Sequence, residues 1–280
     1  MDIYEATNYQ CSKIITQKYS TSFSLGILAF AKEVRNPIYA IYALVRFADE
    51  IVDTFHHHKK EELLQRFEAD TYQAIKEKIS FNPVLHSFQL VVNEYNIEYQ
   101  LIHAFFRSME MDLNQIKYNS EKYEEYIYGS AQVVGLMCLR VFLKNQEAKY
   151  DELKDYARSL GSAFQKINFL RDIKDDFEDK GRTYFPEVNF TQNFTQKEKE
   201  MIENDIKKDF DSAYQGIIRL PVSCRFGVLI AYIFYLSLFN KIKKTPAQKI
   251  MNERIRISNS HKLFLFAYAF YKSKVTPTYS

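Results

Sequence analysis

The scarcity of glycine and proline is the feature that most constrains the fold of this chain. Only 7 Gly and 6 Pro occur among its 280 residues. Sheet-rich and loop-rich folds need turn residues at frequent intervals, so a chain this poor in them favours long helices. No shift in composition, low-complexity linker or internal repeat divides the sequence. We therefore expect one all-α domain over residues 1–280.

Hydrophobic periodicity and helix-capping residues indicate where the helices lie. Asn36 followed by Pro37 is typical of a helix start, which predicts a helix over residues 37–53. Ser120 can cap a single helix over 121–143, and a long helix is expected from about residue 150 to 177. Further helices are expected over 59–79, from Pro83, and over 96–116, 197–219, 222–243 and 262–273. Residues 184–195 are expected to form a loop.

The apolar segments favour a protein without a membrane span. The most apolar run, residues 227–239, is shorter than the roughly 20 residues that a span needs, so we expect a buried helix there. The start, MDIYEATNYQ, lacks the basic and apolar regions of a signal peptide. The segment 262–274 is amphipathic; it is expected to dock as a last core helix, with peripheral contact with a membrane as the alternative.

Charge and cysteine content exclude other classes. A net charge of +3 argues against a dedicated nucleic-acid binder. The cysteines Cys11, Cys138 and Cys224 are far apart and favour a reducing compartment, so we expect a cytoplasmic protein. The chain is rich in aromatic residues, with 23 Phe and 21 Tyr. These favour a thick core, with the lining of a cavity for a long apolar ligand as the alternative.

Asp49 and Asp53 form the first of two acidic pairs. Residues four apart on a helix lie about 40° apart around its axis, so both carboxylates share a face. Like charges at this spacing destabilise an isolated helix by about 0.2–0.5 kcal/mol, which a bound cation would offset. Tyr42 and Arg46 belong to the same stripe. Taken alone, such a pair is also typical of a solvated helix face.

A second polar stripe strengthens the interpretation of the first. It consists of four side chains on one expected helix: Gln165, Asn168, Asp172 and Asp176. Their spacing of three, four and four residues places them within an arc of about 80°. Carboxylate and amide oxygens, without Cys or His, suit a hard cation such as Mg²⁺, whose shell is completed by water and substrate phosphates. Two such helices predict a site where Mg²⁺ neutralises a diphosphate leaving group.

Two arginines accompany the acidic stripes. Arg46 precedes Asp49 by three residues, and Arg171 directly precedes Asp172. A guanidinium can grip phosphate oxygens, and it can equally pair with an adjacent carboxylate. The spacing alone favours neither role.

Together these motifs resemble those of the squalene/phytoene synthase family, the head-to-head trans-isoprenyl diphosphate synthases. The matching segments occur in family order and span about residues 10–190. They are Y-S-T-S-F at 19–23, Y-A-L-V-R-F-A-D-E-I-V-D at 42–53, Y-G-S-A-Q-V-V-G at 128–135, Q-K-I-N-F-L-R-D-I-K-D-D at 165–176 and G-R-T-Y-F-P at 181–186. The resemblance implies an isoprenoid synthase fold with helices around a central substrate cavity.

The resemblance also implies roles for individual residues. Catalytic residues would be Asp49, Asp53, Asp172, Asp176 and the flap residue Tyr184, and the metal ligands would be the same four aspartates with Asn168. Diphosphate binding would involve Tyr19, Ser20, Thr21, Ser22, Tyr42, Arg46, Gln165, Arg171 and the flap residue Arg182. A tunnel for a polyprenyl chain would be lined by Tyr128, Gly129, Ala131 and Gly135. Without the resemblance, the Ser-Thr-Ser run would be interpreted as a helix cap. The sequence departs from the family at Gln132, where glycine is frequent.

The reaction implied is the 1′-1 condensation of two geranylgeranyl diphosphates to phytoene, by way of cyclopropyl prephytoene diphosphate. Mg²⁺, with Mn²⁺ as a substitute, would assist ionisation, and no NADPH is expected. A C30 synthase that uses farnesyl diphosphate to make dehydrosqualene or squalene is the alternative, because product length depends on tunnel depth. A non-catalytic assembly factor on the same fold is a further alternative, which the two intact acidic motifs disfavour. A terpene cyclase shares the aspartate chemistry but lacks the segment at 19–23.

Overall fold

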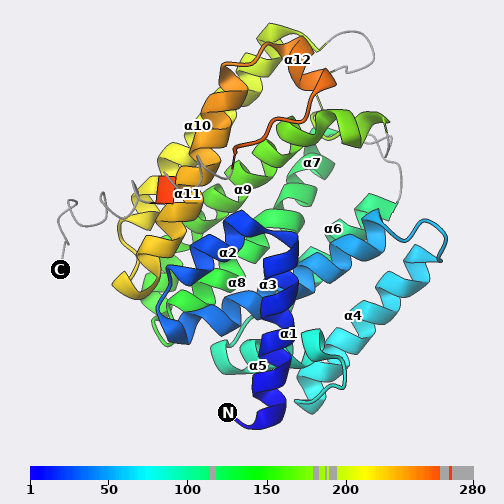
Figure 1. Ribbon diagram of the computed structural model, residues 1–280, viewed down its shortest axis with the longest axis vertical. Coiled ribbons are helices and arrows are strands. Elements are labelled where there is room, and N and C mark those ends of the chain that lie inside the picture. The colour runs from blue at the N-terminus through cyan, green and yellow to red at the C-terminus, as the bar shows by residue number, and fades with distance from the viewer. Residues whose placement is uncertain (114–117, 179–182, 187, 189–193, 259–264, 267–280) are drawn as a thin grey trace.

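The chain folds into helices that lie side by side in a bundle (Figure 1). The computed structural model describes residues 1–113, 118–178, 183–186, 188, 194–258 and 265–266, without the side chains of 175, 177 and 178. The elements in this part are α1 (Ile3–Tyr19), α2 (Thr21–Leu28), α3 (Lys32–Asp53), α4 (Lys60–Glu77), α5 (Pro83–Tyr95), α6 (Tyr99–Leu113), α7 (Ser120–Ile127), a π-helical turn η1 (Tyr128–Gln132), α8 (Val133–Phe142), α9 (Glu147–Glu178), α10 (Gln196–Ile217), α11 (Val222–Lys243) and α12 (Ala247–Asn252). The expectation of an all-α fold is confirmed.

The first two helices have no counterpart among the helices expected from sequence. The buried side of α1 is largely polar, with Asn8, Ser12 and Thr16 among its buried residues, so it lacks an apolar stripe. The hydroxyl groups of Ser12 and Ser87 on α5 lie 2.7 Å apart and satisfy each other. Ser20 ends α1 and caps α2 by accepting a hydrogen bond from the Phe23 amide at 3.1 Å. Its role as a helix cap is therefore observed.

The expected start of α3 at Pro37 is wrong, because α3 begins at Lys32 and Pro37 lies inside it. A proline within a helix removes the hydrogen bond to the carbonyl four residues earlier, here that of Glu33. Glu33 is exposed, so solvent can hydrate this carbonyl. The buried side of Pro37 meanwhile contributes to the core.

The single helix expected over 121–143 is interrupted by the π-helical turn η1. The Val133 amide bonds to the Tyr128 carbonyl, five residues back. Helices on both sides clamp this turn. A Cβ on Gly129 would lie 2.3 Å from the Ala104 carbonyl oxygen of α6, and one on Gly161 of α9 would lie 2.5 Å from the Ala131 carbonyl oxygen. Turns of this kind are frequent at functional sites.

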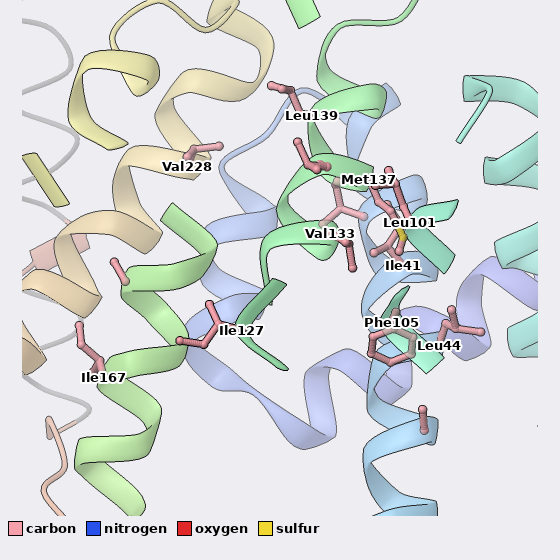
Figure 2. Close-up of a cluster of buried hydrophobic side chains, with 14 of the residues drawn as sticks. Ile41, Leu44, Leu101, Phe105, Ile127, Val133, Met137, Leu139, Ile167 and Val228 are labelled. Carbon is pink, nitrogen blue, oxygen red and sulfur yellow. The ribbon is translucent and has the colours of Figure 1, made fainter. Parts of the chain in front are cut away.

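The hydrophobic core lies where α3, α6, α8 and their neighbours meet. Figure 2 labels buried side chains of this cluster: Ile41 and Leu44 (α3), Leu101 and Phe105 (α6), Ile127 (α7), Val133, Met137 and Leu139 (α8), Ile167 (α9) and Val228 (α11). Burying one such side chain fully contributes about 1.5–3 kcal/mol. This packing fixes α3 and α9, which carry the two acidic stripes.

A polar seam sets the rotation of α9 against α10. Lys166 of α9 is buried and forms ion pairs with Asp205 and with Asp209, the latter at 2.8 Å. Ser162 donates a hydrogen bond to the same Asp209 carboxylate at 2.7 Å. Since breaking a buried ion pair is costly, the seam holds one side of α9 on α10. The side that carries Gln165 lies about 100° around the axis from Lys166.

The apolar helix expected at 227–239 belongs to α11. Within the described residues, α11 is the one helix long and apolar enough to cross a membrane, and 56% of its most apolar window is buried inside the protein. It packs against α2, α9 and α10, as a core helix does. Of the helix expected at 262–273, the structure describes residues 265 and 266 alone, so that expectation stays a prediction.

Candidate active site

The site begins at the C-terminal half of α3, where Arg46 lies among aromatic and acidic groups. Its guanidinium carbon is 4.4 Å from the ring centre of Tyr19, a cation–π arrangement. The same guanidinium pairs with Glu50 and lies 3.9 Å from the Asp49 carboxylate. Its Nε is buried without a hydrogen-bond partner in the described part of the chain. Arg46 thus pairs with adjacent acids here, and its Nε retains a free donor.

Tyr42 lies one helical turn before Arg46. Its ring centre is 5.0 Å from that of Phe23. Burial raises the pKa of Tyr42 to about 12, with Arg46 acting in the opposite direction and the Asp49 charge adding to the rise. At neutral pH the group is a phenol, which can donate a hydrogen bond to an anion.

The second stripe lies on α9 with its amides close together. The Asn168 side chain donates to the Gln165 side-chain oxygen at 3.5 Å. Tyr235 of α11 donates to the Asn168 oxygen at 3.3 Å, and its ring stacks on Phe164 with centres 3.8 Å apart. Tyr235 thereby holds Asn168 in one orientation.

Asp172 is held by two arginines. Arg171 donates to both carboxylate oxygens, at 2.9 and 2.5 Å. Arg254, from the segment after α12, pairs with the same carboxylate at 2.8 Å. Burial disfavours the charge of Arg171, but the hydrogen bonds and charge of Asp172 raise the pKa of its guanidinium above the ordinary value. Asp172 is thereby held from two elements, α9 and the segment after α12.

Tyr235 also connects the two stripes. Its hydroxyl bonds to Asn168 on α9, and it is close enough to Tyr42 on α3 and Arg171 on α9 to contribute to the raised pKa of each. Ser20 hydrogen-bonds to the Tyr42 side chain. Tyr235 therefore lies between residues of α3 and α9, and the pairing of the two acidic stripes in one site stays a prediction.

The remaining diphosphate-binding and acidic residues lie at element ends. Thr21 is exposed, Ser22 is half-buried, and Tyr19 is 48% exposed. Asp53 is half-buried at the last residue of α3, and Asp176 is 8% exposed near the end of α9. Arg182 lies outside the described residues.

Tyr184 is buried in an aromatic cluster. It stacks on Phe169 of α9, with ring centres 4.0 Å apart and planes inclined by 11°. Its hydroxyl donates to Asp112 of α6 at 3.1 Å. Tyr126 of α7 donates to the other oxygen of that carboxylate at 2.6 Å. In this state the expected flap residue is therefore tied to the core beside α9.

The glycines expected to line a tunnel lie instead where helix backbones pack closely against each other. The space beside Gly129 is filled by α6, and a Cβ on Gly135 would lie 2.9 Å from the Ala157 carbonyl oxygen of α9. In both places the missing side chain permits close contact between helix backbones, so it leaves no room there for a polyprenyl chain. The side chain of Gln132 is buried and accepts a hydrogen bond from Arg158 at 2.9 Å. The Arg158 guanidinium also lies 5.6 Å from the Tyr128 ring centre.

The donor set fits a hard divalent cation. The four aspartates and Asn168 offer carboxylate and amide oxygens on two helices, but within the described residues no three acidic, His or Cys side chains are gathered closely enough to hold a metal ion, and Asp172 is occupied by arginines. Oxygen-only ligands at partly open positions suit Mg²⁺ and Mn²⁺, which retain water and phosphate ligands.

Four residues of this region escaped the sequence analysis. They are Glu50, Asp112, Tyr235 and Arg254. Glu50 has a visible signal, since it follows Arg46 by four residues on a helix, the spacing of an ion pair. The other three meet their partners across long stretches of chain, and no local pattern reveals such a contact.

The fold and these contacts together indicate the class of enzyme to which the protein belongs. The protein is all-helical, and its polar site gathers carboxylate, amide, phenol and guanidinium groups from α3, α9 and α11, as in enzymes of the prenyltransferase type. The chain belongs to the squalene/phytoene synthase family, whose sequence model matches residues 16–261. The resemblance inferred from its motifs is thereby confirmed.

The individual relatives share low sequence identity with this chain. "Phytoene synthase 1, chloroplastic" of Solanum lycopersicum is 26% identical over 287 residues, covering 96% of this chain and 69% of the relative. The 4,4'-diapophytoene synthase of Staphylococcus haemolyticus is 27% identical over 207 residues, covering 72% of this chain and 70% of the relative. Among solved structures, a dehydrosqualene synthase in complex with a ligand is similar with a TM-score of 0.82 and 21% identity, covering 97% of this chain and 98% of that one. The squalene synthase HpnC from Alicyclobacillus acidocaldarius gives 0.77 and 16%, covering 90% and 98%. These structures share the fold of this chain.

Proposed function

We propose that this protein condenses two molecules of geranylgeranyl diphosphate head to head, through prephytoene diphosphate, to phytoene, with release of diphosphate. The observation that supports the proposal is that Tyr235 bonds to Asn168 of the α9 stripe and lies near Arg171 and near Tyr42 of the α3 stripe. Relatives named phytoene synthase support the C20 substrate.

The residues of α3 and α9 would hold Mg²⁺ through Asp49, Asp53, Asp172, Asp176 and Asn168. When bound, Mg²⁺ supplies charge that stabilises the departing diphosphate. The oxygens that would bind it lie on rigid helices, and this preorganisation is what makes electrostatic stabilisation of a transition state effective.

The arginines would exchange partners when substrate arrives. Arg171 and Arg254 now bind Asp172, and Arg46 binds Glu50. With substrate bound, these guanidinium groups would turn from the carboxylates to phosphate oxygens, which they bind through two parallel N–H donors. Tyr42, neutral at physiological pH, would donate a further hydrogen bond. No side chain needs to act as a nucleophile, because the second substrate's double bond captures the allylic cation.

Aromatic side chains would shield the reacting carbons from water. Phe23, Phe164 and Tyr235 lie among the polar groups with ring contacts to the site residues. The faces of aromatic rings attract cations, which suits carbocation intermediates that water would quench.

A C30 synthase is the second candidate. The relative named 4,4'-diapophytoene synthase is as similar as the phytoene synthases over the part it matches. In this case two farnesyl diphosphates would react at the same polar site, and the depth of the apolar part would set the product length.

The test is product analysis by mass after incubation of the purified protein with Mg²⁺ and each diphosphate, with and without NADPH. We expect a C40 hydrocarbon from geranylgeranyl diphosphate without NADPH. A C30 product from farnesyl diphosphate, with none from the C20 substrate, would replace the first candidate by the second.

Matched variants separate catalysis from folding. Asp49→Asn and Asp172→Asn should each abolish the product, whereas Asp151→Asn, an exposed acid on α9, should leave the yield unchanged. If the two site variants keep full turnover, the acidic stripes are not the site.

A further inference from the structure

Asp112 is a buried carboxylate for which the proposed reaction has no use. It lies on the last turn of α6 and is 7% exposed. Its two oxygens accept hydrogen bonds from different elements: Oδ2 from Tyr126 of α7 at 2.6 Å, and Oδ1 from Tyr184, which follows α9, at 3.1 Å. Burial of a carboxylate costs several kcal/mol unless its oxygens are satisfied. Both tyrosine hydroxyls are therefore needed to keep this carboxylate buried, and a change at one of them is felt at Asp112.

The contact through Tyr184 leads to the site. The Tyr184 ring stacks on Phe169, and Phe169 is flanked on α9 by Asn168 and, three residues on, by Asp172. The path from the buried carboxylate to the second acidic stripe thus consists of one hydrogen bond and one stacked ring pair. A shift of Tyr184 would free the Phe169 side of α9.

The hydrogen bond from Tyr126 to Asp112 does not lead toward the site on α9. Tyr126 belongs to α7, and its hydroxyl bonds to Asp112 within the joint between α6 and α7. Its ring also packs near Tyr184 and Phe169, but those contacts need no hydroxyl. Replacement of Tyr126 by phenylalanine therefore removes a bond of similar kind and leaves the path to α9 in place.

We infer that Asp112 is a positioning residue for the diphosphate site, which acts through Tyr184 and Phe169 on the orientation of Asn168 and Asp172. The inference rests on the proposed function, and it adds a residue outside the acidic motifs. Misplacement of a binding group by 1 Å can cost about a hundredfold in rate, so a modest displacement of Asp172 is enough for a measurable effect.

The experiment compares wild type, Asp112→Asn, Tyr184→Phe, their double variant, and Tyr126→Phe as the matched control. It measures kcat and KM for the diphosphate that the wild type uses, with thermal unfolding in parallel. A lost bond to a charged acceptor corresponds to about tenfold in rate or more, so Asp112→Asn and Tyr184→Phe should each lower kcat about tenfold. KM should stay within about twofold, because the interaction matters most where leaving-group charge develops.

The double variant tests whether Asp112 and Tyr184 act through the same series of contacts. Its kcat should be no lower than that of the worse single variant, and Tyr126→Phe should keep its kcat within about threefold even where its melting temperature falls. Losses that multiply in the double variant, or a loss in Tyr126→Phe equal to that in Asp112→Asn, overturn the inference. If Asp112→Asn does not fold, the comparison of Tyr184→Phe with Tyr126→Phe decides in the same way.

A second readout does not depend on the reaction. Hydrogen exchange of the α9 amides at 168–173 should be faster in Asp112→Asn and Tyr184→Phe than in wild type, and unchanged in Tyr126→Phe. If the wild type converts no prenyl diphosphate, the proposed function is wrong. The exchange data then still test whether Asp112 positions α9. Equal exchange in all variants overturns the positioning role.

Discussion

Gly129→Ala should destabilise the protein, because the π-helical turn has no room for a side chain. The new Cβ would lie 2.3 Å from the Ala104 carbonyl oxygen and 2.7 Å from the Ser108 Cβ. The first obstacle is backbone, so no rotamer change relieves it. Restoring ordinary contact requires α6 and η1 to separate by roughly 1 Å.

The magnitude follows from two opposing terms. Overpacking of this severity costs about 3 kcal/mol, the upper part of the usual range. Alanine gains up to about 1 kcal/mol over glycine in helical backbone. The net loss is about 2 kcal/mol. An unfolding entropy of about 2.1 cal/mol/K per residue then gives a fall in melting temperature of about 3 °C for a chain of this length.

Circular dichroism melting measures this shift, and Gly26→Ala in α2 is the matched control. Its Cβ would lie 3.5 Å from the Gly227 carbonyl oxygen, an ordinary contact. That variant should gain about 1 kcal/mol and melt about 1–2 °C higher. An unchanged or raised melting temperature for Gly129→Ala, or an equal fall in both variants, would refute the reasoning.

Other outcomes are expected. Lys199→Met leaves Glu203 buried without its partner and should cost about 3–5 kcal/mol in urea unfolding, most of which Lys199→Met with Glu203→Leu should recover. Arg254→Gln removes one partner of Asp172, and steady-state kinetics should find KM for the diphosphate substrate raised about tenfold. Chelation of divalent cations by EDTA should abolish turnover, and added Mg²⁺ should restore it. Burial raises the pKa of Tyr42 to about 12. A raised phenol pKa stabilises the fold below about pH 10, so the denaturation midpoint should fall as pH rises from there toward 12.

Much of the fold follows from local sequence. The shortage of turn residues predicts helices, and apolar periodicity places α4 through α6 and α9 through α11 close to their observed bounds. The failures have physical causes. The buried side of α1 is polar, so it gives no hydrophobic period. The start of α3 is misjudged because Pro37 is tolerated inside the helix, one turn after the exposed residue Glu33.

The site is predictable wherever its residues share a helix. Asp172 and Asn168 are recognisable because their spacing on α9 puts them on one face. Tyr235 and Arg254 are absent from such patterns, since each reaches the site from an element far along the chain. The pairing of the arginines with carboxylates likewise depends on the folded arrangement, which spacing left open.

The π-helical turn makes chain length, as well as residue identity, a constraint on this protein. A π turn accommodates one residue more than an α-helix would over the same stretch. Deleting one residue from 128–132 would therefore restore α-helix while leaving α7 and α8 in their present orientation. An added residue that the turn does not absorb would instead rotate α7 by about 100° relative to α8 and take Tyr126 away from Asp112. Substitutions in this segment and single-residue deletions thus carry different risks, and a variant library should treat them separately.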